Sequence, residues 1–294
     1  MQVHQSMEHL PEIPSPVVTV GSFDGVHVGH RAIIRRLKNL AREVNGSSVL
    51  ITFFPHPRQV LYPDTAGKDL SLINSPSEKI ELLTEAGLDH LIIMEFTLEF
   101  AKTSSEDFVE HYLVGKLHAH TIVVGYNHYF GHNREGSFSS LYKARDLYGF
   151  QVEEIPQQEI QNETVSSTKI RRALKEGNIQ RANAYLEHHF MMRARMERLP
   201  DTDDLPWQPC FWIPLSDPVK ALPPAGEYAA SFLKDQSFEK ALVCINEKKI
   251  LLYPLEIQVS GPEGEALIRF HKRLEARGGS SLPGQLDAVR ELIY

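Results

Sequence analysis

The first half of the chain alternates short apolar runs with segments of helical periodicity. The runs are short enough for strands and cover residues 17–20, 49–54, 90–96, 121–125 and 151–155. Between the first two runs, apolar residues from Ile33 to Val44 recur at helical spacing and form one stripe that can pack on a sheet. Strands that alternate with helices are typical of a parallel sheet with crossover helices. The pattern therefore predicts an α/β fold up to about residue 156.

Local capping signals place further helices. Ser75, Pro76 and Glu78 supply a serine cap, a proline at the first helical position and a glutamate three residues after the cap, which predicts a helix start. Other helices are predicted from Ser104 or Ser105 to Leu117, from Ser139 or Ser140 to Gly149, from Ser167 to Gly177, and from Ile179 to His188. We expect the first domain to cover residues 1–187.

The pattern changes beyond Phe190. Prolines recur between residues 200 and 224, and short runs rich in Val, Ile, Leu and Phe cover residues 210–213, 227–233, 241–245 and 250–259. This pattern of prolines and short apolar runs predicts a smaller antiparallel β-barrel domain over residues 188–294, closed by a helix over residues 283–293.

Composition narrows the class of partner. The net charge of -7 supplies no general positive field, so neither nucleic acid nor a membrane surface is an expected partner. The first fourteen residues contain no apolar segment of the kind that directs secretion or membrane insertion, and a cytoplasmic location is expected. The two cysteines, Cys210 and Cys244, are too few for a disulfide framework or a cysteine-rich zinc site, and we expect both to be buried thiols.

Residues 21–30, which read GSFDGVHVGH, connect the first predicted strand to the first predicted helix. The glycines permit a sharp turn and a close approach of the backbone to a ligand. A helix start near Gly29 and His30 presents free N–H groups, which favour an anion. We therefore predict a phosphate site in which His27 and His30 donate hydrogen bonds to the same group.

Two other interpretations of the histidine pair are weaker. His27 and His30, with Asp24 nearby, have a spacing suited to metal ligands, but no second cluster completes a coordination shell, so no protein-borne metal site is predicted. Histidines with a purely structural role would not need a glycine-rich turn.

The same ten residues resemble the Gly-x-Phe-Asp-Gly-x-His-x-Gly-His block of the bacterial FAD synthetases, the bifunctional riboflavin kinase/FMN adenylyltransferases. The shorter His-x-Gly-His core is shared with other adenylyl- and cytidylyltransferases and alone indicates only the reaction type. Residues 52–57 (TFFPHP) are similar to the family's Thr-Phe-x-Pro-His-Pro, and residues 124–131 (VGYNHYFG), with Gly136, to its Val-Gly-x-(Asp/Asn)-x-x-Phe-Gly. Residues 165–171 (VSSTKIR) are similar to its Ser-Ser-Thr-x-Ile-Arg.

The resemblance implies a Rossmann-like nucleotidyltransferase domain that moves AMP from ATP to FMN, giving FAD and pyrophosphate, with Mg²⁺ accompanying ATP. The implied catalytic residues are His27 and His30 at the α-phosphate and Arg171 at the departing pyrophosphate. The implied ATP-binding residues are Gly21, Phe23, Asp24, Gly29, Asn127, Ser166, Ser167 and Thr168. The implied flavin-binding residues are Phe54, Pro55, His56, Pro57 and His128.

Several of these assignments have plainer alternatives. Ser167 and Thr168 can simply cap a helix, and Asn127 can be a turn residue at the end of a strand. The segment 54–57 can be a turn that packs on the sheet. His128 stands where the family more often has an aromatic residue, which leaves the shape of the flavin site open.

The resemblance weakens in the second domain. The family's kinase signature, Gly-Arg-x-x-Gly-Phe-Pro-Thr-Ala-Asn, has no counterpart, and the equivalent residues 191–201 read MMRARMERLPD. Only residues 222–229 (LPPAGEYA) and 269–274 (RFHKRL) resemble family segments. We therefore expect a degenerate kinase-like domain that does not phosphorylate riboflavin.

Other functions stay open from the sequence. They are a full bifunctional enzyme, another His-x-Gly-His transferase with a different substrate, and a non-catalytic sensor or scaffold that binds flavin nucleotides. Homo-oligomerisation is also left open.

Overall fold

The computed structural model describes residues 1–126, 128–157, 159–160, 163–200, 210–214, 219–234, 237–246, 249–256, 264–274 and 289–291. The chain divides into two compact units. The first unit contains residues 1–70 and 79–165, and the second contains residues 71–78 and 166–294. The helices over residues 167–186, which the sequence analysis placed in the first domain, therefore lie in the second unit.

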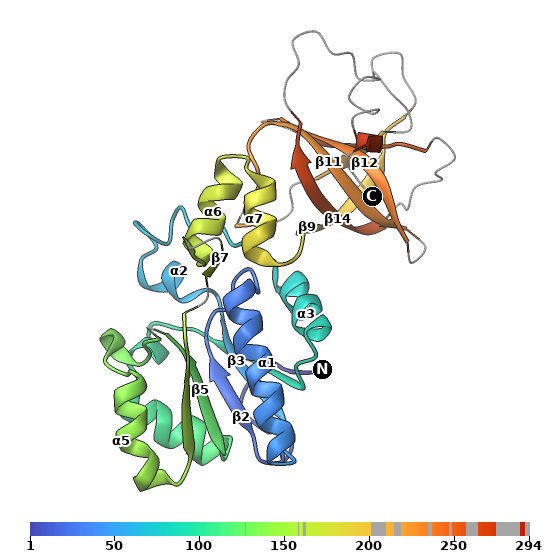
Figure 1. Ribbon diagram of the computed structural model, residues 1–294. Coiled ribbons are helices and arrows are strands. Elements are labelled where there is room, and N and C mark those ends of the chain that lie inside the picture. The colour runs from blue at the N-terminus through green and yellow to red at the C-terminus, as the bar shows by residue number, and fades with distance from the viewer. Residues whose placement is uncertain are drawn as a thin grey trace. The chain divides into compact units, whose positions relative to one another are not determined.

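The first unit is built on a six-stranded parallel sheet (Figure 1). In spatial order its strands are β1 (Gln2–His4), β4 (His90–Glu95), β3 (Ser48–Phe54), β2 (Val17–Val20), β5 (Thr121–Gly125) and β6 (Gln151–Ile155). The predicted Rossmann-like α/β fold is confirmed. From β2 the chain adds β3 and β4 on one side of the sheet and then β5 and β6 on the other. Open α/β sheets bind ligands at such a switch point, here between β2 and β5. Strand β1 was not predicted, because three residues are too few to show a period.

Helices cover both faces of this sheet. Helix α1 (Val28–Glu43) packs Leu37 against Val17 on one face. On the other face Leu113 and Leu141, from the two helical segments described below, pack in one cluster with Val18. Neighbouring residues of a strand point to opposite faces, so the strands are apolar on both sides.

The start of helix α3 (Pro76–Glu85) agrees with the prediction. The main-chain N–H of Ser75 donates to Oε2 of Glu78 at 2.9 Å, and the N–H of Glu78 donates to Oγ of Ser75 at 3.3 Å. These two bonds form the expected capping box.

Two predicted helices differ in detail. Helix α5 (Phe138–Tyr148) is capped by Ser137, and the predicted start at Ser139 or Ser140 is wrong because Ser140 is already the third residue of the helix, where it completes the capping box with Ser137. The helix predicted from Ser104 or Ser105 is present, but it begins as one turn, α4 (Ser105–Asp107), and continues as the wider π-helix η2 (Phe108–Lys116). Apolar spacing does not distinguish these two helix types.

Short elements complete the first unit. They are α2 (Pro57–Leu61), the 3₁₀ turns η1 (Phe100–Lys102) and η3 (His132–Arg134), and the two-stranded ribbon of β7 (Glu159–Ile160) and β8 (Glu163–Thr164). Among the helices that the structure describes, none has the length and apolar character needed to cross a bilayer.

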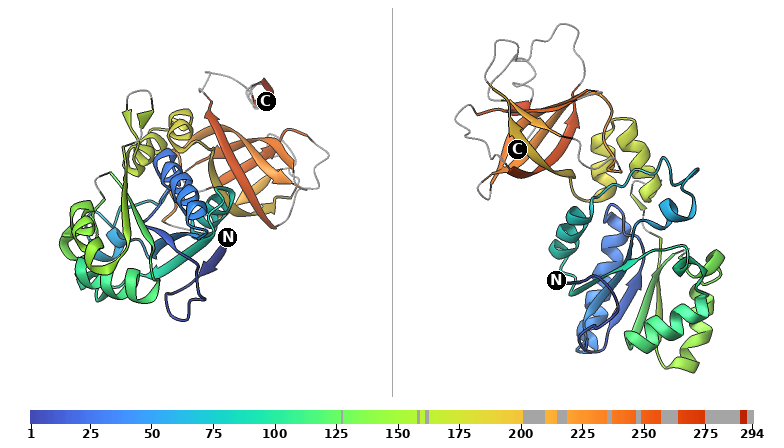
Figure 2. Two further views of the ribbon diagram at one scale, coloured as in Figure 1. Left: turned by 60° about the horizontal axis from the view of Figure 1, so that its bottom comes forward. Right: turned by 180° about the vertical axis from the view of Figure 1, so that it is seen from behind.

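The second unit contains helices α6 (Ser167–Lys175) and α7 (Ile179–Leu186) and a closed antiparallel barrel of six strands (Figures 1 and 2). Around the barrel the strands are β10 (Phe211–Ile213), β13 (Ile250–Pro254), β12 (Ser237–Ile245), β11 (Gly226–Lys234), β14 (Gly264–Arg273) and β9 (Phe190–Arg198). The predicted antiparallel barrel is confirmed. Of the helix predicted over residues 283–293, only residues 289–291 lie within the described part, and they are helical. The predicted strand end at residues 257–259 lies outside the described residues.

Large aromatic side chains occupy the core of the barrel unit. The fully buried ones are Phe190, Phe211, Tyr228, Phe232 and Phe270. A barrel of six strands is narrow enough for side chains to fill it.

Both cysteines are free thiols. Cys210 is fully buried as predicted, whereas Cys244 is only partly buried, so that prediction was wrong for Cys244. Burial raises the pKa of Cys210 to about 11 and that of Cys244 to about 12. Thiols in this state are poor nucleophiles.

Candidate active site

A cavity of about 400 Å³ lies in the first unit at the carboxyl ends of β2 and β5. This volume is within the usual range of small-molecule sites, and the location is the switch point of the sheet. The lining residues are Thr19, Val20, Gly21, Ser22, Phe23, His27, Gly29, His30, Ile33, Gly125, Tyr126, His128, Ile155, Pro156, Gln157, Thr164 and Val165. The structure therefore brings the predicted residues Gly21, Phe23, His27, Gly29 and His30 together with His128. Asp24, also predicted to bind ATP, is not among the residues that line the cavity.

The turn between β2 and α1 is conformationally strained. Phe23 and Val26 have φ angles of 46° and 41°, and Gly25 has a φ of 92°. Left-handed φ values in residues other than glycine cost about 1–3 kcal/mol each, and they persist only where the surroundings hold them. Both side chains are buried, Phe23 at 3% exposure and Val26 at 0%. The turn is therefore locked by its packing.

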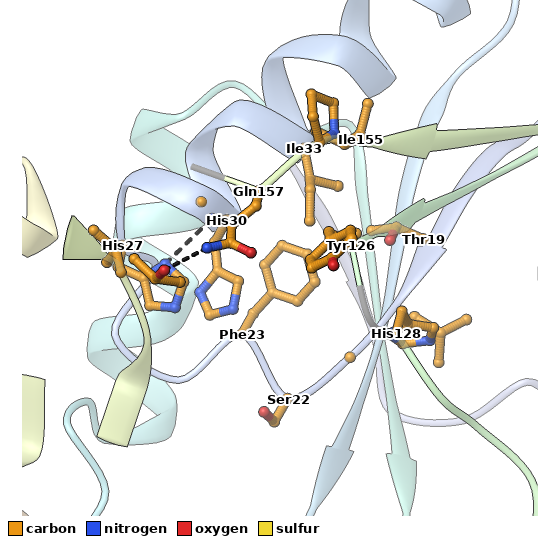
Figure 3. A pocket seen from close by; sticks show the side chains of 17 residues that line it. Thr19, Ser22, Phe23, His27, His30, Ile33, Tyr126, His128, Ile155 and Gln157 are labelled. Atoms are coloured by element: carbon orange, nitrogen blue, oxygen red, sulfur yellow. Dashed lines mark hydrogen bonds between the residues drawn. The ribbon is translucent and has the colours of Figure 1, made fainter. Parts of the chain in front are cut away.

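Three rings stack along the cavity wall (Figure 3). The ring of His30 lies 4.4 Å from the ring of Phe23 and 3.7 Å from the ring of His27, measured between centroids. His27 is the N-cap residue of α1, and its Nδ1 accepts a hydrogen bond from the main-chain N–H of His30 at 3.4 Å. Because Nδ1 accepts, the neutral ring of His27 carries its proton on Nε2.

His30 has unused hydrogen-bonding capacity. Its Nδ1 is buried and has no hydrogen-bond partner among the described residues. Burial, followed by the charges of His27 and Lys79, lowers the pKa of His30 well below its usual value, so the ring is neutral at physiological pH. A buried polar atom without a partner is uncommon in a folded protein, and in a cavity it indicates a place for a ligand.

Two glycines of the turn make room for these rings. A Cβ on Gly29 would lie 3.3 Å from Cε1 and Nδ1 of His27, and a Cβ on Gly21 would lie 3.1 Å from Cε2 of Phe23. The sequence analysis assigned Gly29 to close approach of the ligand. The structure adds that both glycines accommodate the ring stack.

Lys79 is a charged neighbour of the site that sequence reasoning missed. Its Nζ donates to the main-chain oxygen of Ser22 at 2.7 Å, and Oγ1 of Thr52 donates to the same oxygen at 3.3 Å. The carboxylate of Asp24, only 1% exposed, acts on Lys79 by its charge. No motif indicated Lys79, because it lies on α3, outside all four family-like segments.

The predicted flavin-binding residues separate into two groups. Residues 54–57 are not among the residues that line the cavity; Phe54 is 52% exposed at the end of β3, and His56 caps α2 by accepting from the N–H of Arg58 at 3.1 Å. His128 does line the cavity. Burial, with a smaller effect of the Arg134 charge, lowers the pKa of His128 to about 4.

The remaining predicted residues belong to the second unit or lie outside the described residues. Ser166 is the N-cap of α6 and accepts from the N–H of Lys169 at 3.3 Å, so Ser167 and Thr168 are the first two helical residues rather than the cap. Nε of Arg171 donates to the main-chain oxygen of Ser71 at 2.8 Å, within the second unit. Asn127 lies outside the described residues.

The described residues contain no group of three or more His, Cys, Asp or Glu side chains placed to hold a metal ion. The polar lining instead consists of imidazoles, hydroxyls and amide groups, and these suit the phosphates and rings of a nucleotide.

Solved structures share this architecture. The crystal structure of a macrolide-efflux protein from Streptococcus pneumoniae matches with a TM-score of 0.84 over 99% of this chain and 97% of that chain, at 22% sequence identity. At this identity the likeness shows the fold alone.

Sequence comparison is more specific. Bifunctional riboflavin kinase/FMN adenylyltransferases are similar to this chain: the Listeria monocytogenes protein is 34% identical over 60% of this chain and 55% of its own length, and the Escherichia coli K12 protein is 31% identical over 79% of this chain and 74% of its own length. The match thus spans about half the length of the Listeria relative. The model of the FAD synthetase family matches residues 11–169, which include the histidine-bearing turn and the cavity. The chain belongs to the FAD synthetase family and carries that family's nucleotidyltransferase domain.

Proposed function

We propose that the protein transfers the AMP group of ATP to the phosphate of FMN, forming FAD and pyrophosphate, and that it does not phosphorylate riboflavin. The observation that carries the first part is the stacked pair of His27 and His30 at the start of α1, inside the cavity, with the buried Nδ1 of His30 unpaired among the described residues. The identity of the substrates, ATP and FMN, is inferred from membership of the FAD synthetase family.

The reaction needs no nucleophile from the protein. A phosphate oxygen of FMN forms a bond to the α-phosphorus of ATP while the bond from that phosphorus to the bridging oxygen breaks, and pyrophosphate leaves with the electron pair. Catalysis then depends on positioning and on neutralising charge at the phosphate oxygens. Neutral imidazoles that carry N–H donors can stabilise the α-phosphate as its charge shifts.

The residues predicted to contact the phosphates of ATP have separate roles in this scheme. His27 and His30 donate to the α-phosphate. Ser166, Ser167 and Thr168 offer hydroxyl and N–H groups at the start of α6 to the β- and γ-phosphates, and Arg171 binds the departing pyrophosphate. Part of the guanidinium of Arg171 is already bonded to Ser71.

In this proposal Mg²⁺ is bound by the substrate ATP rather than by a site on the protein. It prefers oxygen ligands and keeps several waters, so it is expected to enter with the triphosphate of ATP. Asn127, which the family resemblance implies to be an ATP-binding residue, is a candidate to orient a phosphate, a ribose or the hydrated ion.

The absence of kinase activity is proposed from the second unit's sequence. The curated relatives are named as bifunctional enzymes. In this chain the equivalent stretch forms most of β9. Residues 191–201 contain no glycine, no threonine and no asparagine. A phosphate cradle and a Pro-Thr-x-Asn metal anchor therefore have no counterpart there. Cytoplasmic location and the lack of nucleic-acid or membrane partners stay predictions from the sequence.

The transferase activity is tested with the purified protein, Mg²⁺-ATP and FMN, by separating flavins chromatographically and measuring pyrophosphate. We expect FAD to form, and we expect His30→Ala to lower kcat by about 10²-fold or more, as for other lost transition-state donors. His111→Ala, at an exposed histidine on η2, is the control and should retain the wild-type rate. A His30→Ala enzyme with near-normal turnover would contradict the assignment.

The kinase proposal is tested by replacing FMN with riboflavin in the same assay. We expect neither FMN nor FAD to appear, because residues 191–201 contain no glycine, threonine or asparagine that could form the family's phosphate cradle and metal anchor. Time-dependent formation of FMN by the pure protein, absent when ATP is omitted, would show that the kinase is active.

A further inference from the structure

The ammonium group of Lys79 anchors the strained turn at one main-chain atom. The oxygen of Ser22 accepts from Nζ of Lys79 at 2.7 Å and from Oγ1 of Thr52 at 3.3 Å. Ser22 directly precedes Phe23, the first of the residues in the turn with positive φ. Hydrogen bonds to a charged donor contribute more than neutral ones, so Lys79 supplies the stronger of the two anchors.

The same ammonium group is electrostatically coupled to the site. Burial lowers the pKa of Lys79, and the charge of the almost completely buried carboxylate of Asp24 opposes this shift by favouring the protonated form. A buried carboxylate needs a compensating charge or hydrogen bonds. The titratable groups that act on His30 are His27, at the same helix start, and Lys79, from α3.

We propose that Lys79 is a positioning residue for adenylyl transfer: its ammonium group holds the carbonyl of Ser22 and balances the carboxylate of Asp24, so that the turn presents the rings of His27 and His30 in one fixed stack. This inference rests on the function proposed for the cavity. Lys79 also adds, after burial and the charge of His27, to the lowering of the pKa of His30, because a nearby positive charge disfavours a second one.

Two consequences distinguish this role from simple structural support. Removing Lys79 should reduce kcat more than it changes the KM for ATP, since the displaced groups act on the transition state. It should also raise the pKa of His30, because one of the charges that lowers that pKa is gone. The acid limb of the kcat–pH profile should therefore move to higher pH.

The experiment compares wild type with Lys79→Met, Lys79→Gln and Lys79→Arg. Methionine removes the donor and the charge, glutamine removes the charge but keeps a donor, and arginine keeps both. Lys38→Met is the matched control, because Nζ of Lys38 also donates to a main-chain oxygen of the same unit, that of Ala86 at 2.9 Å, but lies outside the cavity lining. Thermal unfolding of each variant is recorded first.

We expect Lys79→Met to lower kcat by about 10²-fold, the scale of a misplaced catalytic group. Its acid limb should move up in pH. Lys79→Gln should show the same shift with a smaller loss of rate, Lys79→Arg should keep the wild-type limb, and Lys38→Met should match wild type in both respects. If Lys79→Met does not fold, Lys79→Gln decides. An unchanged acid limb in the neutral variants, or an equal shift in Lys79→Arg, overturns the proposal.

A titration of His30 by NMR separates this inference from the proposed function. If wild type makes no FAD, the adenylyltransferase proposal fails, but the pKa of His30 in wild type and in Lys79→Gln can still be compared. A higher pKa in the variant supports the role of Lys79, and an identical pKa overturns it.

Discussion

At the scale of the residue, burial and neighbouring charges determine how the histidines of the cavity respond to pH. His27 keeps Nδ1 as an acceptor through its bond to the N–H of His30, and His30 is held neutral by burial and by neighbouring charge. His128 lines the same cavity and has a pKa of about 4 because of burial. His30 and His128 are therefore suited to act as neutral rings near neutral pH.

The depressed pKa of His128 predicts a loss of stability in acid. The unfolded chain, with an ordinary histidine pKa of 6.5, binds this proton more readily than the folded one, so the contribution of His128 is complete above pH 6.5 and is lost as the pH falls toward about 4. A shift from 6.5 to about 4 corresponds to about 3 kcal/mol. We expect His128→Phe to remove this part of the pH dependence, measured by urea unfolding at pH 7 and near pH 4.5.

His111→Phe, at an exposed position, serves as the control and should leave the pH dependence as it is in wild type. If His128→Phe loses as much free energy of unfolding between the two pH values as wild type does, the ring of His128 is not responsible.

At this scale the sequence identified the residues that form a local motif. The spacing of Gly21, His27, Gly29 and His30 predicted a shared phosphate site, and all four line one cavity. Lys79 could not be found in this way, because its contact with Ser22 joins residues 57 positions apart. The same limit applies to the aromatic stack, which depends on the φ angles of the turn.

At the scale of the element, the start of helix α1 combines two competing requirements. Gly29 lies in the first helical turn, where alanine would be about 0.5–1 kcal/mol more favourable than glycine. A Cβ at this position, however, would lie 3.3 Å from two ring atoms of His27, so the ring would have to move by a few tenths of an ångström. Glycine at position 29 thus leaves room for the ring of His27 but makes the helix less stable than alanine would.

This conflict predicts opposite effects on stability and activity. We expect Gly29→Ala to keep or slightly raise the Tm, while kcat for FAD formation falls by roughly tenfold or more because the donor is misplaced. Differential scanning calorimetry and initial rates on the same preparation check this. A variant as active as wild type would mean that the ring of His27 can shift without consequence.

Elements were predictable where a local signal exists. The capping box of α3 and the apolar runs of the inner strands gave both type and position, whereas α2 was missed because its five residues follow a Pro-His-Pro segment that also suits a turn. Strand β9 was missed because its alternation is formed by methionine and arginine, whose long side chains blur an apolar pattern.

At the scale of the whole molecule, the segment 71–78 is tied to the barrel unit by long-range contacts. The N–H of Leu72 donates to the oxygen of Val219 at 2.6 Å. Nζ of Lys220 donates to Oε2 of Glu78 at 2.5 Å and to the main-chain oxygens of Ile73 and Met191 at 2.6 and 2.8 Å. From the sequence, Glu78 was only a capping residue. Its ion pair spans 142 positions, and no local pattern encodes it.

Because this ion pair is buried, we expect substitution of either partner to lower the free energy of unfolding of the second unit strongly. The side chains of Lys220 and Glu78 are 5% and 1% exposed, and each has further main-chain partners, since the N–H of Arg193 donates to Oε1 of Glu78 at 2.8 Å. Removing one partner leaves the other charge buried, so Lys220→Met should lower the free energy of unfolding by about 3–5 kcal/mol. Adding Glu78→Gln to Lys220→Met should restore part of that loss, and a double-mutant cycle from urea unfolding measures the coupling. If the two losses simply add, the pair does not hold the segment to the barrel, and the main-chain bonds of Leu72 must do so instead.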